Sequence, residues 1–185
     1  MRLIVAISGA SGAIYGVRIL EELKKQGVES HLVISRWGEV TIPRETDYSF
    51  QEVKDKADFY YCNDNLGAVI ASGSTKFEGM IIAPCSMKTL ASIASGYSED
   101  LIARAADVTL KEGRKLLLMV RETPLSPIHL ENMLKLSRIG VVIMPPVPTF
   151  YTNPSSLEEV VDQTVGRALA QFDIEVTGFR SWPGI

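Results

Sequence analysis

Cysteine, histidine and long apolar runs are scarce in this sequence, and each shortage argues against one class of protein. The 185 residues include two cysteines and two histidines, too few for a disulfide framework and without metal-ligand spacing. No apolar stretch reaches the ~20 residues that a membrane-spanning helix needs. The formal net charge of -3 argues against a nucleic-acid-binding protein, because phosphate backbones select strongly basic surfaces. We therefore expect no metal, no membrane association and no nucleic-acid partner.

The length and composition indicate one globular domain. A chain of 185 residues is long enough for a single compact domain and short for two. Hydrophobic residues make up 46% and charged residues 22%, as in ordinary folded proteins. Residues 2–8 form a strand pattern with neither a charged leader nor a small-residue cleavage site before it, which predicts a cytoplasmic protein.

Short apolar runs alternate with helical patterns along the chain. The apolar runs predict buried strands over residues 3–7, 30–34, 79–83, 115–120 and 141–144. Helical spacing predicts helices over residues 15–25, 90–95, 101–111, 130–137 and 157–172. This alternation is typical of an α/β protein with a doubly wound parallel sheet, here a single-domain Rossmann-like (flavodoxin-like) fold. In such folds, ligands bind beyond the carboxyl ends of the strands.

The loop after the first strand has the composition of a phosphate-binding turn. Residues 8–13 read SGASGA, and such small residues let the backbone approach a phosphate at the start of a helix. The glycines at 9, 12 and 16 do not form the dinucleotide fingerprint, and Ser35 and Arg36 replace the acidic residue that would hold a ribose. This favours a mononucleotide. Arg36 leaves NADP open, and a turn that binds no ligand is the remaining alternative.

A second strand-to-helix turn, residues 83–90 (APCSMKTL), follows the 79–83 strand. Ser86 and Thr89 resemble a helix-capping pair, which is a sufficient structural reason for both residues. Two such turns on neighbouring strands would form opposite walls of one crevice, and this favours a binding role. Cys85 has no His or Asp nearby to activate it, so we interpret it as a small packed residue.

Several charged residues occupy positions that need an explanation. Arg121 and Glu122 directly follow a predicted strand, where sites lie in this fold, and the planar guanidinium of Arg suits phosphate. Arg104 and Lys111 stand two helical turns apart and share one face. For Lys111 and Arg167, simple solvent exposure is the ordinary explanation.

A proline-rich loop, residues 145–154, follows the last predicted strand. Its prolines reduce the entropy lost on ordering. Phe150 and Tyr151 can line an apolar pocket, with the Tyr151 hydroxyl free to meet a phosphate. A purely structural loop is the alternative. Each histidine, His31 and His129, is interpreted as a residue with a local hydrogen bond rather than a catalytic group.

Taken together, these motifs resemble the UbiX family of flavin prenyltransferases. Their order and spacing match from residue 1 to about residue 167, and the resemblance is to the bacterial members described as components of phenolic acid or 4-hydroxybenzoate decarboxylases. The motifs are GASGA at 9–13, RETD at 44–47, APCSMKTL at 83–90, RAADV at 104–108, VRETP at 120–124, IHLENMLKL at 128–136 and FY at 150–151.

The resemblance implies a set of site residues. For FMN it implies Gly9, Ala10, Ser11, Ser35, Ser86, Met87, Lys88, Thr89 and Arg121. For dimethylallyl monophosphate it implies Arg104, Lys111, Arg121, Glu122, Tyr151, Arg167 and Trp182. For catalysis it implies Ser11, Glu45 and Glu122, without a metal. Asp100 stands where the family pattern has Asn, one turn before Arg104, and we expect it to weaken the hold of that arginine on the site.

The resemblance also implies a reaction and an assembly. The dimethylallyl group would be joined to N5 and C6 of reduced FMN, and the prenylated FMN would serve a UbiD-type aromatic acid decarboxylase. Residues 1–185 would form one flavoprotein domain of a homododecamer with sites between subunits, and a tail from about residue 174 would contact a neighbour.

Three alternatives stay open. The first is a non-catalytic FMN-binding subunit of an aromatic acid decarboxylase. The second is an NADP-dependent oxidoreductase that uses Arg36. The third is a flavoprotein that decarboxylates peptidyl cysteine, which is expected to need a His after the first helix, where this sequence has none.

Overall fold

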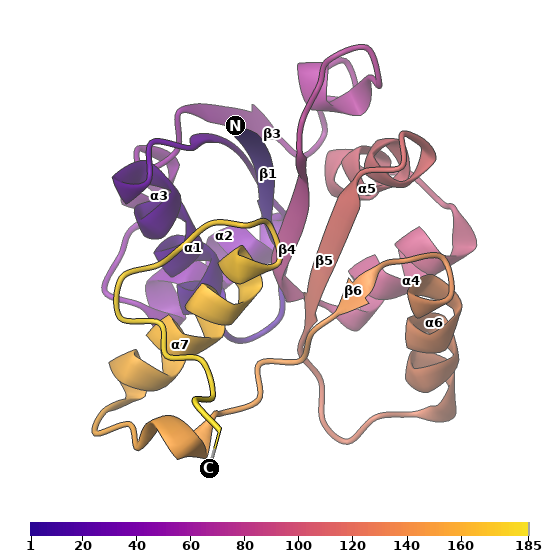
Figure 1. Ribbon diagram of the computed structural model, residues 1–185. Coiled ribbons are helices and arrows are strands. Elements are labelled where there is room, and N and C mark those ends of the chain that lie inside the picture. The colour runs from indigo at the N-terminus through magenta and orange to yellow at the C-terminus, as the bar shows by residue number, and fades with distance from the viewer. Residues whose placement is uncertain (185) are drawn as a thin grey trace.

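Six parallel strands form one sheet in the computed structural model, which describes residues 1–184 (Figure 1). They are β1 (Arg2–Ile7), β2 (Glu29–Ile34), β3 (Phe59–Cys62), β4 (Gly79–Cys85), β5 (Lys115–Val120) and β6 (Val142–Ile143), in the order β3-β2-β1-β4-β5-β6. The chain winds outward from β1 to β3 and then returns to start again at β4. This is the strand order of Rossmann folds, whose crevice lies where the winding reverses, at the carboxyl ends of β1 and β4. The predicted fold class is confirmed.

Helices cover both faces of the sheet (Figure 1). One face carries α1 (Ala13–Lys25), α2 (Arg36–Glu45), α3 (Phe50–Lys54) and α7 (Leu157–Ala170); the other carries α4 (Met87–Ser95), α5 (Leu101–Lys111) and α6 (Pro127–Ser137). Two short 3₁₀ turns, η1 (Val69–Ala71) and η2 (Phe150–Thr152), lie in connections. Among the described residues, no helix has the length and apolar character needed to cross a bilayer.

The core follows the alternation of the central strand. In β1, Leu3, Val5 and Ile7 pack against α1 and α7, whereas Ile4 and Ala6 pack against α4 and α5. All of these side chains are buried, and each contributes about 1–3 kcal/mol to folding. Burial on both faces explains why the strand reads as a continuous apolar run.

A charged network joins α1 to the segment that follows α2. The Glu21 carboxylate accepts hydrogen bonds from Arg18 Nη1 at 3.0 Å and from the Tyr48 hydroxyl at 2.9 Å, and pairs with Lys56 Nζ at 2.8 Å. Burial alone would raise the pKa of Glu21, but the hydrogen bonds from these three neighbours hold that pKa below its ordinary value. The network therefore favours the charged carboxylate.

The stretch between β2 and β4, for which the sequence predicted no element, contains α2, α3 and β3. The α2 helix includes Pro43 and buries only Gly38 and Ile42, so its apolar periodicity is weak. The β3 strand lies at the edge of the sheet, and its four residues, FYYC, form only a short and half-exposed run. The other predicted elements are present, with ends that differ by a few residues.

Candidate active site

A cleft of about 420 Å³ lies at the carboxyl ends of the central strands, where the topology places a ligand. It joins the loops that follow β1, β2, β3 and β4 with the start of α5. The predicted FMN residues Gly9, Ser35, Ser86, Lys88 and Thr89 come together here. The remaining lining residues are Arg36, Trp37, Asn63, Asp64, Glu99 and Asp100. A cleft of this size falls in the range of small-molecule sites.

Two helix N-termini open on the cleft, each capped by a serine. Ser35 Oγ accepts a hydrogen bond from Gly38 N at 3.1 Å at the start of α2. Ser86 Oγ accepts one from Thr89 N at 3.3 Å at the start of α4, and the two hydroxyls lie 3.1 Å apart. Helix N-termini carry partial positive charge and attract anions. This wall of the cleft therefore suits a phosphate.

Gly9 allows the first turn to pack closely on α2. A Cβ atom at this position would lie 2.2 Å from Cβ of Trp37, far inside any real contact distance, and a side chain would push the turn out of place. Ala10 is buried beneath the turn and Ser11 is exposed at its tip. The packing therefore requires glycine at position 9 of the predicted loop.

The N-terminus of α1 is already occupied by a carboxylate. Glu45 Oε2, from the last turn of α2, accepts hydrogen bonds from Gly12 N at 2.7 Å and Ala13 N at 3.3 Å. The sequence predicted that a phosphate approaches the backbone at the start of this helix, and the structure places the Glu45 carboxylate there. A negative charge at the positive end of a helix is favourable, and it disfavours a phosphate at the same place. The N-termini of α2 and α4 are the better anion sites.

Arg121 and Glu122 lie at the edge of the sheet that carries the cleft, directly after β5. Arg121 N donates a hydrogen bond of 3.1 Å to the Cys85 carbonyl, which fixes its backbone beside the end of β4. A carboxylate oxygen of Glu122 accepts a 3.0 Å bond from Thr123 N. Both side chains are exposed and available to a ligand.

Arg104 and Lys111 do not reach this cleft in the same chain. Arg104 donates to the Ala71 carbonyl at 3.2 Å and pairs with Asp107 at 2.8 Å, and Lys111 pairs with Glu112. Lys111 ends α5, just before β5 begins, whereas Arg121 follows the end of β5. The six residues of β5 span about 20 Å, so one chain places Lys111 and Arg121 at opposite ends of this strand.

Asp100 caps α5 and makes no ion pair with Arg104 among the described residues. Its carboxylate is the N-cap of α5 and accepts a 2.9 Å hydrogen bond from Ala103 N. Arg104 pairs with Asp107 instead. The part of the chain that the structure describes therefore has no ion pair between these two side chains, and an effect of Asp100 on the hold of Arg104 on a ligand stays a prediction. Capping is a common use of Asp, and it accounts for the carboxylate at this position.

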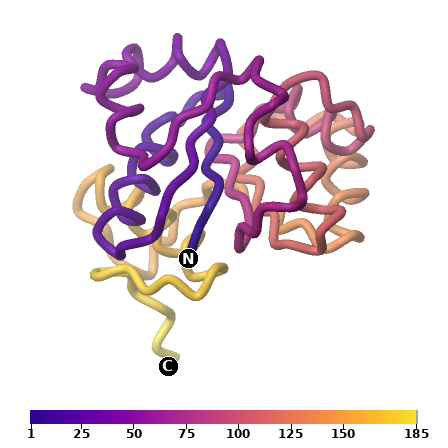
Figure 2. The backbone as a smooth tube through the Cα atoms, turned by 90° about the horizontal axis from the view of Figure 1, so that it is seen from above, coloured from indigo at the N-terminus to yellow at the C-terminus, as the bar shows by residue number. Residues whose placement is uncertain are grey.

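Tyr151 and Trp182 lie together on the surface. Their rings meet edge to face with centroids 5.2 Å apart, and the Tyr151 hydroxyl donates to the Arg180 carbonyl at 3.4 Å. Both are exposed, as is Arg167 near the end of α7. Figure 2 shows the last described residues projecting from the rest of the molecule. Trp182 therefore contacts Tyr151 of its own chain.

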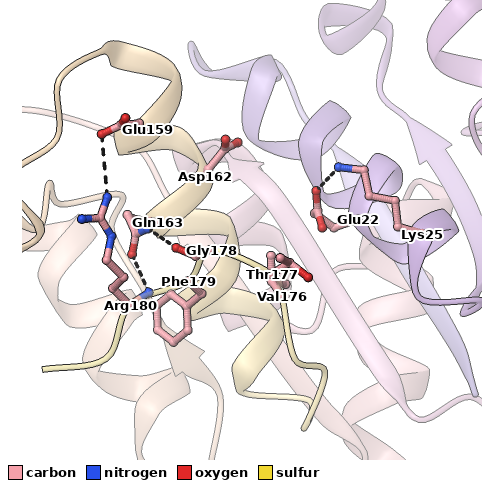
Figure 3. Close-up of a pocket in the computed structure, with 10 residues that line it drawn as sticks. All are labelled: Glu22, Lys25, Glu159, Asp162, Gln163, Val176, Thr177, Gly178, Phe179 and Arg180. Carbon is pink, nitrogen blue, oxygen red and sulfur yellow. Dashed lines mark hydrogen bonds and ion pairs between the residues drawn. The ribbon is translucent and has the colours of Figure 1, made fainter. Parts of the chain in front are cut away.

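The tail that carries Trp182 is held to α7 by a buried glutamine (Figure 3). Gln163 is 5% exposed. Its amide donates to the Gly178 carbonyl at 2.7 Å, and its side-chain oxygen accepts from Arg180 N at 3.0 Å. Nearby, a Cβ atom on Gly166 would lie 2.7 Å from Phe179. One face of α7 thus holds the tail against the domain.

The remaining nucleophilic and titratable candidates have structural roles. Cys85 is fully buried, and burial raises the pKa of its thiol, so the packed interpretation is confirmed. His31 is hydrogen-bonded to the Tyr61 hydroxyl at 2.9 Å and to Glu29 at 2.8 Å. His129 Nδ1 accepts from Ser126 N at 3.2 Å in a capping box. The prediction of local hydrogen bonds for both histidines is confirmed.

Some cleft residues were not singled out from the sequence. Trp37 follows the Ser35 cap, Asn63 and Asp64 follow β3, and Glu99 precedes α5. The run Phe59–Cys62 is rich in strand-forming aromatic residues and is followed by the turn residues Asn63 and Asp64. This pattern was the available signal for a strand end at the cleft.

Comparison with known proteins gives close matches over the whole chain. Residues 1–169 match the flavoprotein family. A probable UbiX-like flavin prenyltransferase of Bacillus subtilis is 54% identical over 185 residues, which cover 100% of this chain and 91% of that protein.

Two crystal structures have nearly the same fold. A dodecameric FMN-dependent UbiX-like decarboxylase from Escherichia coli O157:H7 superposes with a TM-score of 0.98 at 51% identity, covering 100% of both chains. AnUbiX, crystallised with FMN and dimethylallyl pyrophosphate, gives a TM-score of 0.98 at 50% identity, covering 100% of this chain and 98% of that one. Together with the cleft at the carboxyl ends of β1 and β4, these matches show that the chain belongs to the flavoprotein family and, within it, to the UbiX-like flavin prenyltransferases.

Proposed function

We propose that this protein is a flavin prenyltransferase that transfers a dimethylallyl group from dimethylallyl monophosphate to N5 and C6 of reduced FMN. The observation that carries the proposal is the cleft itself: two serine-capped helix N-termini face a small-residue turn at the point where the winding of the sheet reverses. Such a cleft suits a flavin mononucleotide, with its one phosphate and its flat ring.

In this proposal the residues of the cleft hold FMN by its phosphate and along its edges. Ser35 and the turn Ser86, Met87, Lys88 and Thr89 receive the phosphate at the starts of α2 and α4. The backbone of Gly9, Ala10 and Ser11 lies along the flavin, and Arg121 meets its far end. Bound reduced FMN supplies a nucleophilic N5 and an electron-rich C6.

The allylic donor is proposed to bind between subunits. Arg121 and Glu122 of one copy and Arg104 and Lys111 of another would surround its phosphate, since one chain holds Lys111 at the end of β5 opposite to Arg121 and holds Arg104 in bonds to Ala71 and Asp107. Tyr151, Arg167 and Trp182 are all exposed and would be presented to a neighbouring copy. The assembly is proposed to be the dodecamer seen for the Escherichia coli O157:H7 relative.

The first bond forms between flavin N5 and C1 of the allyl group as the C1–O bond breaks. Phosphate leaves with the electron pair and accepts the proton that N5 loses. The charge that grows on the leaving phosphate is stabilised by Arg121, Lys111 and Arg167, the kind of electrostatic effect that usually dominates in such sites. Aromatic side chains stabilise the cationic character of the allyl group. Because these side chains neutralise a monophosphate, the proposal requires no metal.

The second bond joins the tertiary prenyl carbon to flavin C6. The alkene gains one proton and C6 loses one, so the step needs both an acid and a base. Glu122 with Ser11, or the departing phosphate, is proposed to relay these protons. Glu45 of α2 lies close to Ser11, because its carboxylate accepts hydrogen bonds from the next two residues, Gly12 and Ala13.

The wider setting follows from the same proposal. The product, prenylated FMN, would be passed to a UbiD-type aromatic acid decarboxylase. Residues 1–185 would act as one flavoprotein domain, whose tail from about residue 174 presents Trp182. We place the protein in the cytoplasm, where unpaired thiols such as those of Cys62 and Cys85 are ordinarily found.

The substitution Glu122→Gln separates this function from that of a non-catalytic FMN-binding subunit. We expect the variant to bind FMN like the native protein but to form the product linked at both N5 and C6 at least about 100-fold more slowly, because the second bond needs the Glu122 proton relay. Glu131→Gln, on the exposed surface of α6, is the matched control and should behave like the native protein. A native rate of product formation by Glu122→Gln would contradict the catalytic role, and native protein that bound FMN without prenylating it would support the carrier.

A further inference from the structure

We propose that Ser8 is a positioning residue for the flavin, and that its hydroxyl sets the spacing of the two turns that form the walls of the cleft. The proposal rests on the proposed function, because it concerns the same FMN site. Ser8 is the first residue after β1 and is 1% exposed. Its side chain is therefore closed off from any ligand and acts only through its neighbours.

The Ser8 hydroxyl joins the end of β1 to the turn that follows β4. Ser8 Oγ donates a 2.8 Å hydrogen bond to the Pro84 carbonyl and accepts a 2.8 Å hydrogen bond from Ser86 N. Ser8 N donates a further bond of 3.2 Å to the same Pro84 carbonyl. These three bonds link two segments that are remote in the sequence, at the point where the β1–β4 ladder gives way to the cleft.

The side chain takes over a role that the backbone has elsewhere in the ladder. Between parallel strands, the N–H and C=O of one residue bond to two residues of the neighbour. The Ser8 N–H follows this pattern, but the Ser86 N–H bonds to the Ser8 hydroxyl. A hydroxyl is both donor and acceptor, so one small side chain can close the ladder where the two chains diverge.

This connection fixes the residue that caps α4. Ser86 is the N-cap of α4, and its own hydroxyl accepts from Thr89 N at 3.3 Å. Ser8 also precedes Gly9, whose packing against Trp37 leaves no free space. Without the Ser8 hydroxyl, the part-buried Ser86 N–H loses its partner, and the loss of this hydrogen bond makes the observed position of the turn less favourable. The turn after β1 and the turn after β4 would then no longer be held at a fixed distance from each other.

Ser8→Ala tests the proposal, with Ser30→Ala as a matched control. Ser30 is also 1% exposed. Its hydroxyl also accepts from a backbone N–H, that of Asp58 at 3.2 Å, and donates to the Asp58 carboxylate at 3.1 Å. Ser30 pairs with Leu3 near the start of β2, at the amino-terminal end of the strands and away from the cleft. The two substitutions thus remove the same kind of bridge from the two ends of the sheet.

We expect both variants to unfold at a lower temperature than the native protein, but only Ser8→Ala to bind FMN weakly. Its dissociation constant for FMN, measured by flavin fluorescence, should rise by about tenfold. At saturating FMN, its KM for dimethylallyl monophosphate should stay near the native value, and Ser8→Thr, which keeps the hydroxyl, should restore FMN affinity. If Ser8→Ala is insoluble, Ser8→Cys, with a weaker hydrogen-bonding group, gives the same comparison.

The outcomes distinguish this proposal from the function on which it rests. If the native protein and Ser8→Ala bind FMN equally well, or if Ser30→Ala weakens FMN binding as much, the positioning role of Ser8 is refuted and the proposed function stands. If the native protein binds no FMN at all, both proposals fail.

Discussion

A site shared between subunits can be tested by mixing two inactive variants in one assembly. Lys111→Met removes a cation from the end of α5, and Glu122→Gln removes the carboxylate that follows β5. We expect each variant alone to form inactive assemblies. If an active site takes Lys111 from one copy and Glu122 from another, a mixed assembly contains sites in which both residues are native.

The expected activity follows from random mixing and from the length of β5. The six residues of β5 separate Lys111 from the Arg121 end by about 20 Å, whereas a charge-assisted contact with one phosphate needs about 3 Å. One chain therefore cannot supply both sides of the phosphate. With equal amounts of the two variants, about one quarter of the shared sites receive both native residues.

The assay uses two different affinity tags, one on each variant, and purification over both. Formation of the flavin linked at both N5 and C6 by the doubly tagged assemblies is measured at saturating reduced FMN and dimethylallyl monophosphate, beside each variant alone. Activity near one quarter of the native value agrees with a shared site. Mixed assemblies no more active than the single variants would refute the reasoning, because a site within one chain never regains both residues.

Three further predictions test separate parts of the structure. Gln163→Leu removes both side-chain hydrogen bonds that hold the tail. We expect altered Trp182 fluorescence, faster proteolysis of the tail and a higher KM for the allylic donor. An unchanged KM in a variant whose tail is released would contradict the role of the tail. The lowered pKa of Glu21 means that its contribution to stability is present above pH 4.5 and is lost as the pH falls through the folded-state pKa. Glu21→Gln should therefore lower the free energy of unfolding at pH 7 by about 1–3 kcal/mol and flatten its acid dependence in urea titrations, and an unaltered acid dependence would count against the network. Because burial raises the pKa of the Cys85 thiol, iodoacetamide should label exposed Cys62 but leave Cys85 unmodified until the protein is unfolded. Mass spectrometry locates the label, and label on Cys85 in the folded protein would contradict this prediction.

Much of the fold could be predicted because its central strands are buried on both faces. The runs at residues 3–7, 79–83 and 116–120 are buried and carry no charged residue, and each forms most or all of a strand of the sheet. The edge strand Phe59–Cys62 is partly exposed and carries no such run. The α2 helix was missed because Pro43 and a mostly exposed surface obscure its period.

The strand ends in the candidate site could be predicted, but the contacts between loops could not. Ser35, Ser86 and Arg121 each follow a strand or its turn, and parallel strands bring such positions to one edge. The bond from Glu45 to the start of α1 and the bridge made by Ser8 join residues far apart in the sequence. No local pattern encodes such tertiary contacts, which depend on how α2 and β4 pack beside β1.

The central claim is that the cleft between the starts of α2 and α4 binds FMN and that the protein prenylates it there. The most direct test is anaerobic incubation of the purified protein with reduced FMN and either dimethylallyl monophosphate or the diphosphate, followed by mass measurement of the released flavin. We predict a flavin heavier by one five-carbon unit with at least one of the two donors. Unchanged FMN with both donors, in protein shown to have bound the flavin, would contradict the claim.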